Sequence, residues 1–424
     1  MQEITPSLEP QQLGDTTSTR ATDIPVTGHG DKHIWGIYLA LCLISVVELY
    51  SASSREVASS SIGVFGPIVR HVAMLLGGFG IMWIISRMHY RKFIGWTLLF
   101  SFVSVALMVY VMFKGEIING ARRSVTIGIA IQPAEFIKLA SVLVVAWVMS
   151  RTQKRKAIGV EDRGIIISAI AIMLFGSLFI KQGLTNTLLL MAISLSMMLI
   201  GGVKFSKFLA VVGIYMIFAG GYMVFKPSDG DGRHDTWAAR IERFKDPTPK
   251  YEQEIDAKNR QEMYAYMAQA NGGVFGVFPG NSRETARLPL AFSDYIFSII
   301  IEDTGLVGGI VVLILYLWLL ARASGIASRC SRAYPALLVI GMAVMIVFQA
   351  LFHMAIVTGV FPVSGQPLPL ISKGGTSILI TSIAFGIMLS VSRHAVRHTD
   401  KRALIKEEIN SMPEQMQAEN PTQL

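Results

Sequence analysis

Long apolar runs separated by short polar loops fill the chain from about residue 34 onward. A bilayer core about 30 Å thick needs roughly 20 apolar residues in helical conformation, so each such run is a candidate membrane span. The pattern predicts ten spans, at residues 34–54, 64–86, 93–113, 134–150, 164–181, 185–202, 207–225, 293–321, 334–361 and 374–392. We therefore expect an all-α polytopic membrane protein, with residues 34–395 as its membrane domain.

Composition supports this expectation and excludes other classes. Of 424 residues, 52% are hydrophobic and only 16% are charged, which is too apolar for an ordinary soluble domain. The net charge of +9 could suggest nucleic acid, but no polar domain exists to present a basic face, so we expect no nucleic-acid partner. The two cysteines give no metal-ligand spacing, and we expect no protein-bound metal centre. Residues 1–33 and 396–424 are polar, and we expect a disordered N-terminus and a tail there.

The distribution of basic residues predicts the orientation of the chain. If the N-terminus is cytoplasmic, the inner loops and the tail carry 18 Lys and Arg residues and the short outer loops carry 6. Positive charge favours the cytoplasmic side, so both termini should be cytoplasmic. The long polar segment 226–292, between the seventh and eighth spans, should then be a large extracytoplasmic loop. Its first part has helical composition, and its second part, NGGVFGVFPGNS, is rich in glycine and must turn tightly.

Ionisable residues within apolar spans are costly, so each needs a reason. Glu135 and Lys138 stand three residues apart behind Pro133, which suits the first turn of a helix and places both on one face. They can form a structural ion pair or act directly. Asp294 lies at the start of the eighth span, where it can act on a substrate or simply cap the helix together with Ser293. Glu302 lies eight residues further, about 12 Å deeper in a straight helix, and needs partners inside the bundle.

Further features predict an anion site at the outer face. Arg122 and Arg123 fall between the third and fourth spans, and Lys373 directly precedes the last span. The segment before Lys373 is rich in proline and glycine, and such irregular backbone is tolerated at membrane depth only inside protein or beside a wet cavity. Cations beside such a cavity suit a phosphate or pyrophosphate. A merely rigid re-entrant turn is the alternative.

Four stretches resemble motifs of the SEDS family, the FtsW/RodA/SpoVE proteins of bacterial division, elongation and sporulation. They are NGARRSVTIGIAIQPAEFIKLA, NGGVFGVFPGNS, AFSDYIFSIIIEDTGLVG and GVFPVSGQPLPLISKGGTS. They occur in the family's order, and the resemblance covers about residues 34–395. The polar N-terminal extension and GDKHIWGIYLALCLISVVELYSASS resemble the FtsW branch more than the RodA branch.

The resemblance implies a peptidoglycan glycosyltransferase that polymerises lipid II at the outer face of the cytoplasmic membrane and releases undecaprenyl pyrophosphate. By the resemblance Asp294 is the catalytic residue, and Glu135, Lys138 and Glu302 are polar residues of the bundle. The residues that would bind the pyrophosphate are Arg122, Arg123, Ser372, Lys373 and Gly374. Asp294 would take the proton of an acceptor hydroxyl, and the cations would stabilise the leaving group, with Mg²⁺ or Mn²⁺ as a further aid.

The resemblance also implies partners and a location. Members of the family work with a class B penicillin-binding protein, a transpeptidase, so we expect such a partner and other divisome membrane proteins. The expected location is the inner membrane at the division septum.

The sequence departs from the family's motifs at several positions. Ser124 replaces an aromatic residue, Gly183 replaces an acid, His353 replaces an asparagine, and Lys373 replaces an aromatic residue. None of these changes touches Asp294. An elongation polymerase, a flippase of lipid-linked sugars and a division scaffold without activity remain as alternatives.

Overall fold

The computed structural model describes residues 30–52, 65–118, 121–127, 129–154, 159–180, 183–225, 242, 244, 254–256, 259–285, 287–288 and 292–410. Most of them are helical. The helices are α1 (Lys32–Ala52), α3 (Phe65–Arg87), α4 (Lys92–Lys114), α5 (Pro133–Arg151), α6 (Asp162–Ile180), α7 (Leu184–Ile200), α8 (Phe205–Phe225), α10 (Arg260–Gly272), α11 (Ile296–Ala327), α12 (Ala333–Val357) and α13 (Gly375–Asn410).

Each of the ten predicted spans coincides with a helix. Within the described residues, eight helices are long and apolar enough to cross a membrane. The apolar parts of α7 and α8, Thr185–Ile200 and Phe205–Phe218, are shorter. The predicted helical, polytopic membrane fold is therefore confirmed, and the full count of ten crossings stays a prediction.

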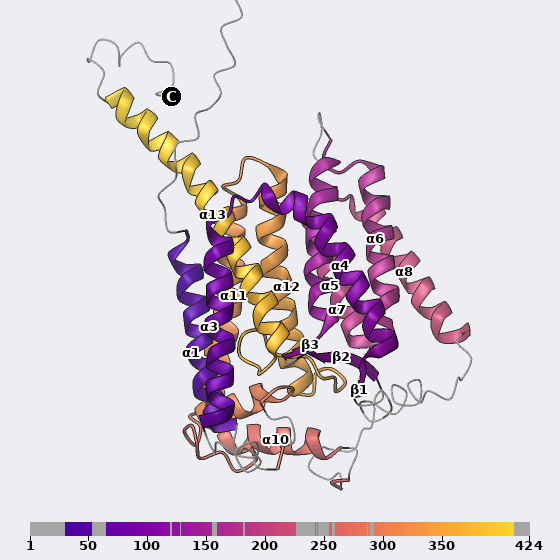
Figure 1. The fold of residues 1–424 in the computed structure, drawn as a ribbon, viewed down its shortest axis with the longest axis vertical. Coiled ribbons are helices and arrows are strands. Elements are labelled where there is room, and N and C mark those ends of the chain that lie inside the picture. The colour runs from indigo at the N-terminus through magenta and orange to yellow at the C-terminus, as the bar shows by residue number, and fades with distance from the viewer. Residues whose placement is uncertain are drawn as a thin grey trace, which may run out of the picture.

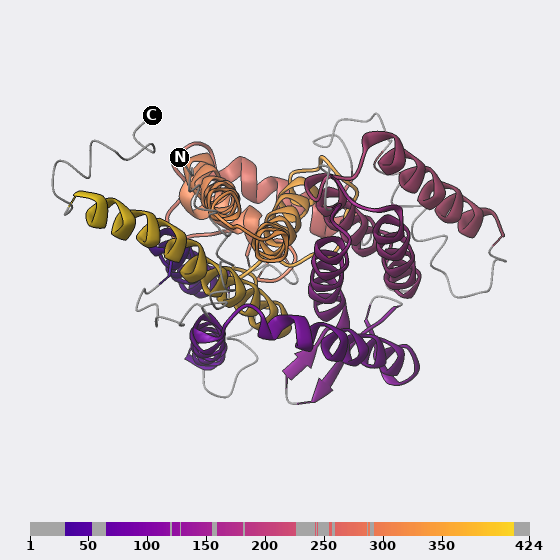
Figure 2. The same cartoon turned by 90° about the horizontal axis from the view of Figure 1, so that it is seen from above.

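The helices form a bundle with a buried centre (Figures 1 and 2). Most of α5, α12 and the Gly375–Arg393 part of α13 is buried, whereas only 22% of the spans in α3 and α4 is buried. Large apolar side chains on the peripheral helices are exposed, including Leu43, Phe102, Phe113 and Ile217. Outward-facing apolar residues around a bundle whose backbone groups are satisfied within helices suit a hydrocarbon environment.

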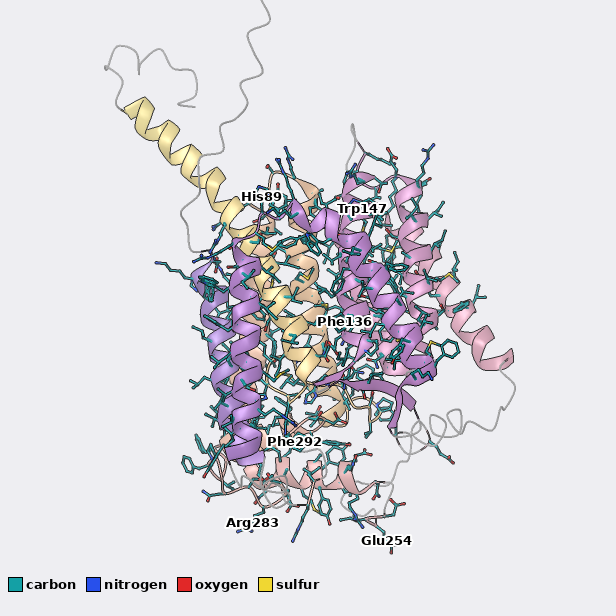
Figure 3. All side chains as sticks on the ribbon, in the orientation of Figure 1. His89, Phe136, Trp147, Glu254, Arg283 and Phe292 are labelled. Carbon is teal, nitrogen blue, oxygen red and sulfur yellow. The ribbon has the colours of Figure 1, made fainter. Side chains whose placement is uncertain are left out.

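The two ends of the bundle differ. His89 and Trp147 lie at one end, and Phe292, Arg283 and Glu254 lie at the other (Figure 3). The predicted cytoplasmic loop containing His89 is thus opposite the predicted outer loop. In the part of segment 226–292 with helical composition, residues 260–272 form α10, which runs across the lower end of the bundle in Figure 1. The stretch TWAARIERFKD (236–246) has helical composition too. That stretch lies almost entirely outside the described residues.

A small sheet at the same end was not predicted. Strands β1 (Glu116–Ile118), β2 (Ala121–Ile127) and β3 (Ile129–Ile131) pair antiparallel in that order. The sequence did carry a signal for it, because Asn-Gly occupies positions 119–120, between the paired residues Ile118 and Ala121. At the end of β3, the N–H of Gln132 donates to Thr376 Oγ1 (3.1 Å), which joins the sheet to the first turn of α13.

The opposite end is held by Asp31. Its Oδ1 accepts the N–H groups of His33 (2.9 Å) and Ile34 (3.2 Å), and so caps α1. Its Oδ2 accepts a bond from Arg322 of α11, and its own N–H donates to Ser392 Oγ of α13 (3.0 Å). One residue therefore ties three helices together.

Replacing Asp31 with Asn should weaken this junction in a pH-dependent way. Burial raises the pKa of the Asp31 carboxyl, but the bond from Arg322 and the two N–H bonds outweigh it, so the pKa lies below its usual 3.8. The ion pair therefore stabilises the fold at neutral pH, and its contribution is lost only as the pH falls through that lowered pKa. We expect Asp31→Asn, which keeps a capping oxygen, to cost about 0.5–1 kcal/mol at pH 7 and nothing in strong acid.

Thermal unfolding in nanodiscs at several pH values measures this effect. Asp31→Ala serves as the comparison, because it also removes the cap and should cost about 1 kcal/mol more. Equal stability of Asp31→Asn and the original protein at pH 7 would contradict the assignment.

Candidate active site

Asp294 lies in the turn that leads into α11, half-buried at the end of the bundle that also carries α10. Ser293 Oγ donates to its Oδ1 (3.0 Å). The N-cap position of α11 is Tyr295, which makes no side-chain capping bond. The simple alternative that Asp294 or Ser293 occupies the N-cap is therefore wrong, because the helix begins at Ile296 and not near Ser293.

The irregular segment 358–374, between α12 and α13, lies directly against this turn. Lys373 N donates to the carbonyl of Phe292 (3.0 Å), and Ser372 Oγ donates to the carbonyl of Ser293 (2.7 Å). A Cβ atom added to Gly365 would lie 2.6 Å from Asp294 Oδ2, so only a glycine fits there without displacement. Asp294 and Gly365, which are 71 residues apart in sequence (365 − 294), thus form one site.

Side chains from the surrounding helices bind the backbone of segment 358–374. Four of its carbonyls accept bonds from residues of α1, α11 and α12. The pairs are His353 Nδ1 to Gln366 O (2.5 Å), Gln349 Nε2 to Pro367 O (3.2 Å), Tyr316 Oη to Pro369 O (2.6 Å) and Ser45 Oγ to Ile371 O (2.9 Å). This is how non-helical backbone is tolerated inside an apolar bundle.

The residues predicted to bind an anion lie at this end of the bundle, and they differ in what they contact. Lys373 is half-buried, with its Nζ 4.9 Å from the ring centroid of Phe292. Ser372 is buried, and its hydroxyl also accepts the N–H of Leu368 (2.8 Å), so it braces the segment. Gly374 is half-buried and directly precedes α13. Arg122 and Arg123 lie in β2, and their side chains are outside what the structure describes.

Glu135 and Lys138 form a fully buried ion pair, as their spacing allowed. Lys138 Nζ donates to Glu135 Oε1 (2.7 Å) and to Gln349 Oε1 (2.7 Å). Helix α5 begins at Pro133, as predicted. Gln349 of α12, which the sequence analysis missed, also binds the carbonyl of Pro367. The pair therefore holds α5, α12 and segment 358–374 together.

We expected Glu302 to find its partners inside the helical bundle, but they lie on the outer loop. Its carboxylate accepts bonds from Asn271 Nδ2 (2.7 Å), Ser282 Oγ and Arg283 N (3.0 Å). Helix α11 is not continuous, because it breaks at Gly305, three residues after Glu302, where φ is 73°. A Cβ there would lie 2.1 Å from the carbonyl oxygen of Val274. Glu302 thus fixes the glycine-rich segment 271–283 against the first part of α11.

Two departures from the family's motifs are explained by local geometry. Gly183 has a φ of 145°, a conformation that side chains rarely adopt, so an acid would be strained there. His353 is buried and binds segment 358–374 through the carbonyl of Gln366. Both replacements are compatible with the site around Asp294.

Fold and site together define a polytopic membrane protein with a half-buried carboxylate at one end of its helical bundle, built against a re-entrant segment. A profile of the FtsW/RodA/SpoVE family, described as "Cell cycle protein", matches residues 31–397. The chain belongs to this family.

Three similar proteins illustrate the range of the family. The chain is 31% identical to the probable peptidoglycan glycosyltransferase FtsW of Trichlorobacter lovleyi, over 84% of this chain and 91% of that protein. It is 26% identical to the peptidoglycan glycosyltransferase MrdB of Escherichia coli, over 86% and 94% of the two chains. A chain from the structure of a peptidoglycan synthase complex has the same fold, with a TM-score of 0.66, 22% identity and coverage of 86% and 98%.

Removing the buried cation at position 138 should be strongly destabilising. Lys138→Met leaves the Glu135 carboxylate buried without its partner, and we expect a loss of about 3–5 kcal/mol in the free energy of unfolding. Adding Glu135→Leu removes the unpaired charge and should restore most of that loss. Thermal unfolding in nanodiscs would compare the single and double variants.

Lys207→Met is the matched control. Lys207 pairs with Asp162 at the surface, where an ion pair contributes at most about 1 kcal/mol. A single variant at position 138 that is as stable as the original, or a double variant no better than the single one, would contradict the buried-pair interpretation.

Proposed function

We propose that this chain is a peptidoglycan glycosyltransferase that polymerises lipid II into glycan strands at the outer face of the cytoplasmic membrane. The observation that carries the proposal is the contact between Asp294 and segment 358–374. This contact brings two stretches that resemble motifs of the family, the one around Asp294 and the one in segment 358–374, together at the Asp294 carboxylate. Relatives named as peptidoglycan glycosyltransferases, both FtsW and MrdB, align over more than four fifths of the chain.

In this proposal Asp294 is the general base. Glycosyl transfer to a sugar hydroxyl requires that its proton be removed as the new bond forms, and a half-buried carboxylate at the end of the bundle can accept it. Ser293 donates to Oδ1, so Oδ2 is the oxygen that faces Gly365 and the segment.

The leaving group needs charge stabilisation rather than a proton, because a lipid pyrophosphate is already a good leaving group. Lys373 lies next to the first turn of α13, and the N-terminus of a helix favours an anion. Gly374, without a side chain, would let a phosphate approach that turn. Ser372 would act by holding Lys373 in place. The sheet whose strand β2 carries Arg122 and Arg123 is joined to α13 through Gln132, which follows β3.

A divalent cation at this site would be held by one carboxylate together with the phosphates of the substrate. Within the described residues, no group of three or more His, Cys, Asp or Glu side chains could hold a metal ion. Mg²⁺ commonly binds through one carboxylate together with substrate phosphates. Asp294 is the carboxylate at the site, and a bound Mg²⁺ or Mn²⁺ would add positive charge beside the pyrophosphate.

The remaining assignments extend the same proposal. Residues 34–395 would be the catalytic domain. The two terminal segments, 1–33 and 396–424, would lie in the cytoplasm, and segment 226–292 would lie on the outer side of the membrane. A class B penicillin-binding protein would cross-link the product, and other divisome proteins would be partners. Similarity to FtsW at 31% identity supports action at the division septum of the inner membrane, with elongation as the second candidate because MrdB is also a relative.

The test is glycan-strand formation from labelled lipid II by the full-length protein with its cognate transpeptidase. Asp294→Asn removes the base without changing side-chain size, and we expect the rate of polymerisation to fall about 10²–10⁴-fold. Asp162→Asn, an exposed carboxylate at the opposite end, should polymerise at the original rate. Polymerisation by Asp294→Asn at the normal rate would refute the general base. Absence of product from the intact, unsubstituted complex would refute the polymerase, and lipid flipping in vesicles would then be measured.

A further inference from the structure

Three polar side chains meet beside the candidate active site without a role in the proposed chemistry. They come from three parts of the chain: Asn186 from α7, His353 from α12, and Gln366 from segment 358–374. Gln366 Nε2 donates to Asn186 Oδ1 (2.7 Å), and His353 Nδ1–H donates to the carbonyl of Gln366 (2.5 Å). His353 and Gln366 are only 1% and 2% exposed.

Gln366 directly follows Gly365, the residue that touches the Asp294 carboxylate. The contact leaves no room for a side chain, so a small displacement of Gly365 changes the surroundings of Asp294 Oδ2. The bonds to His353 and Asn186 fix both the backbone and the side chain of Gln366. They therefore fix the position of Gly365 as well.

Helix α12 holds the same segment from two successive turns. Gln349 and His353 are four residues apart, so they lie on one face of the helix, and they bind the adjacent carbonyls of Pro367 and Gln366. Gln349 in turn binds the buried pair Glu135–Lys138. The segment is thus attached to α12 at two points and to α7 at a third.

Stability alone does not account for this cluster. Within the described residues, Gln366 Oε1 and His353 Nε2 are buried without a hydrogen-bond partner. Buried polar atoms without partners are costly, so apolar side chains of the same size would suit a purely structural role better. Polar groups at these positions fix one geometry of the segment instead.

We propose that Gln366, held by His353 and Asn186, is a positioning residue that sets Gly365 against the Asp294 carboxylate. The proposal rests on the proposed function, because Asp294 is the base whose geometry it controls. It deepens that function by naming a further residue on which the catalytic step depends. Misplacement of a reacting group by about 1 Å can lower a rate about 10²-fold, so small displacements are sufficient.

Kinetics of Gln366→Met provide the first test. Methionine keeps the length of the side chain but cannot donate to Asn186. We expect the kcat of lipid II polymerisation to fall about 10- to 100-fold, with KM and the thermal unfolding temperature little changed. Gly365→Ala, which displaces the contact directly, should give the same pattern. Val360→Thr, an exposed position of the same segment, is the control and should retain full activity.

Conservative rescue at His353 separates positioning from packing. Asparagine can present an N–H donor near the place of Nδ1, whereas leucine cannot. We expect His353→Asn to keep most of the kcat and His353→Leu to lose it as Gln366→Met does. Equal activity of the two His353 variants, or an unchanged kcat in Gln366→Met, would overturn the proposal.

A readout without catalysis keeps the two proposals distinguishable. In an Asp294→Cys background, the rate of thiol alkylation by iodoacetamide, with loss of iodide, reports how closely the segment covers position 294. Adding Gln366→Met should raise that rate several-fold, whether or not the protein polymerises lipid II. An unchanged alkylation rate would refute the positioning role. Absence of polymerisation by the intact, unsubstituted complex would instead refute the proposed function.

Discussion

The site depends on the satisfaction of irregular backbone inside an apolar bundle. Segment 358–374 is not helical, and its carbonyl groups would be costly at membrane depth without partners. Each of four carbonyls accepts a bond from a helix side chain, and the Leu368 N–H is accepted by Ser372. These bonds allow a non-helical segment to pack against Asp294 inside the bundle. Without them, Gly365 could not be held against the carboxylate.

The residues that satisfy this backbone were also the hardest to find from sequence. Helix lengths follow directly from apolar runs, and the motif around Asp294 and the Glu135–Lys138 spacing are local patterns. Gln349 and Tyr316 are instead single polar residues within apolar helices. Their role comes from a partner far along the chain, and no local period marks it. Features that depend on a local pattern could therefore be predicted from the sequence. Residues whose partner is distant in the chain could not.

The errors on α11 have the same origin. A continuous apolar pattern from residue 293 to 321 predicted one unbroken span. The helix instead breaks at Gly305, where the carbonyl of Val274 approaches too closely for any side chain. The glycine was visible in the sequence, but the reason for it lies in a loop some 30 residues earlier. The Asn-Gly pair at positions 119–120 was, by contrast, a local signal that could have predicted the hairpin.

The two ends of the bundle are held by different means, and the difference bears on the reaction. At one end Asp31 joins α1, α11 and α13 through its carboxylate and its N–H. The same three helices also meet segment 358–374 or its flank, through Ser45, Tyr316 and the start of α13. A transporter must open the two ends alternately, which would require these bonds to break in turn. An enzyme that acts at one face needs only a rigid site with access from that face, and a bundle tied at both ends favours this mode of action.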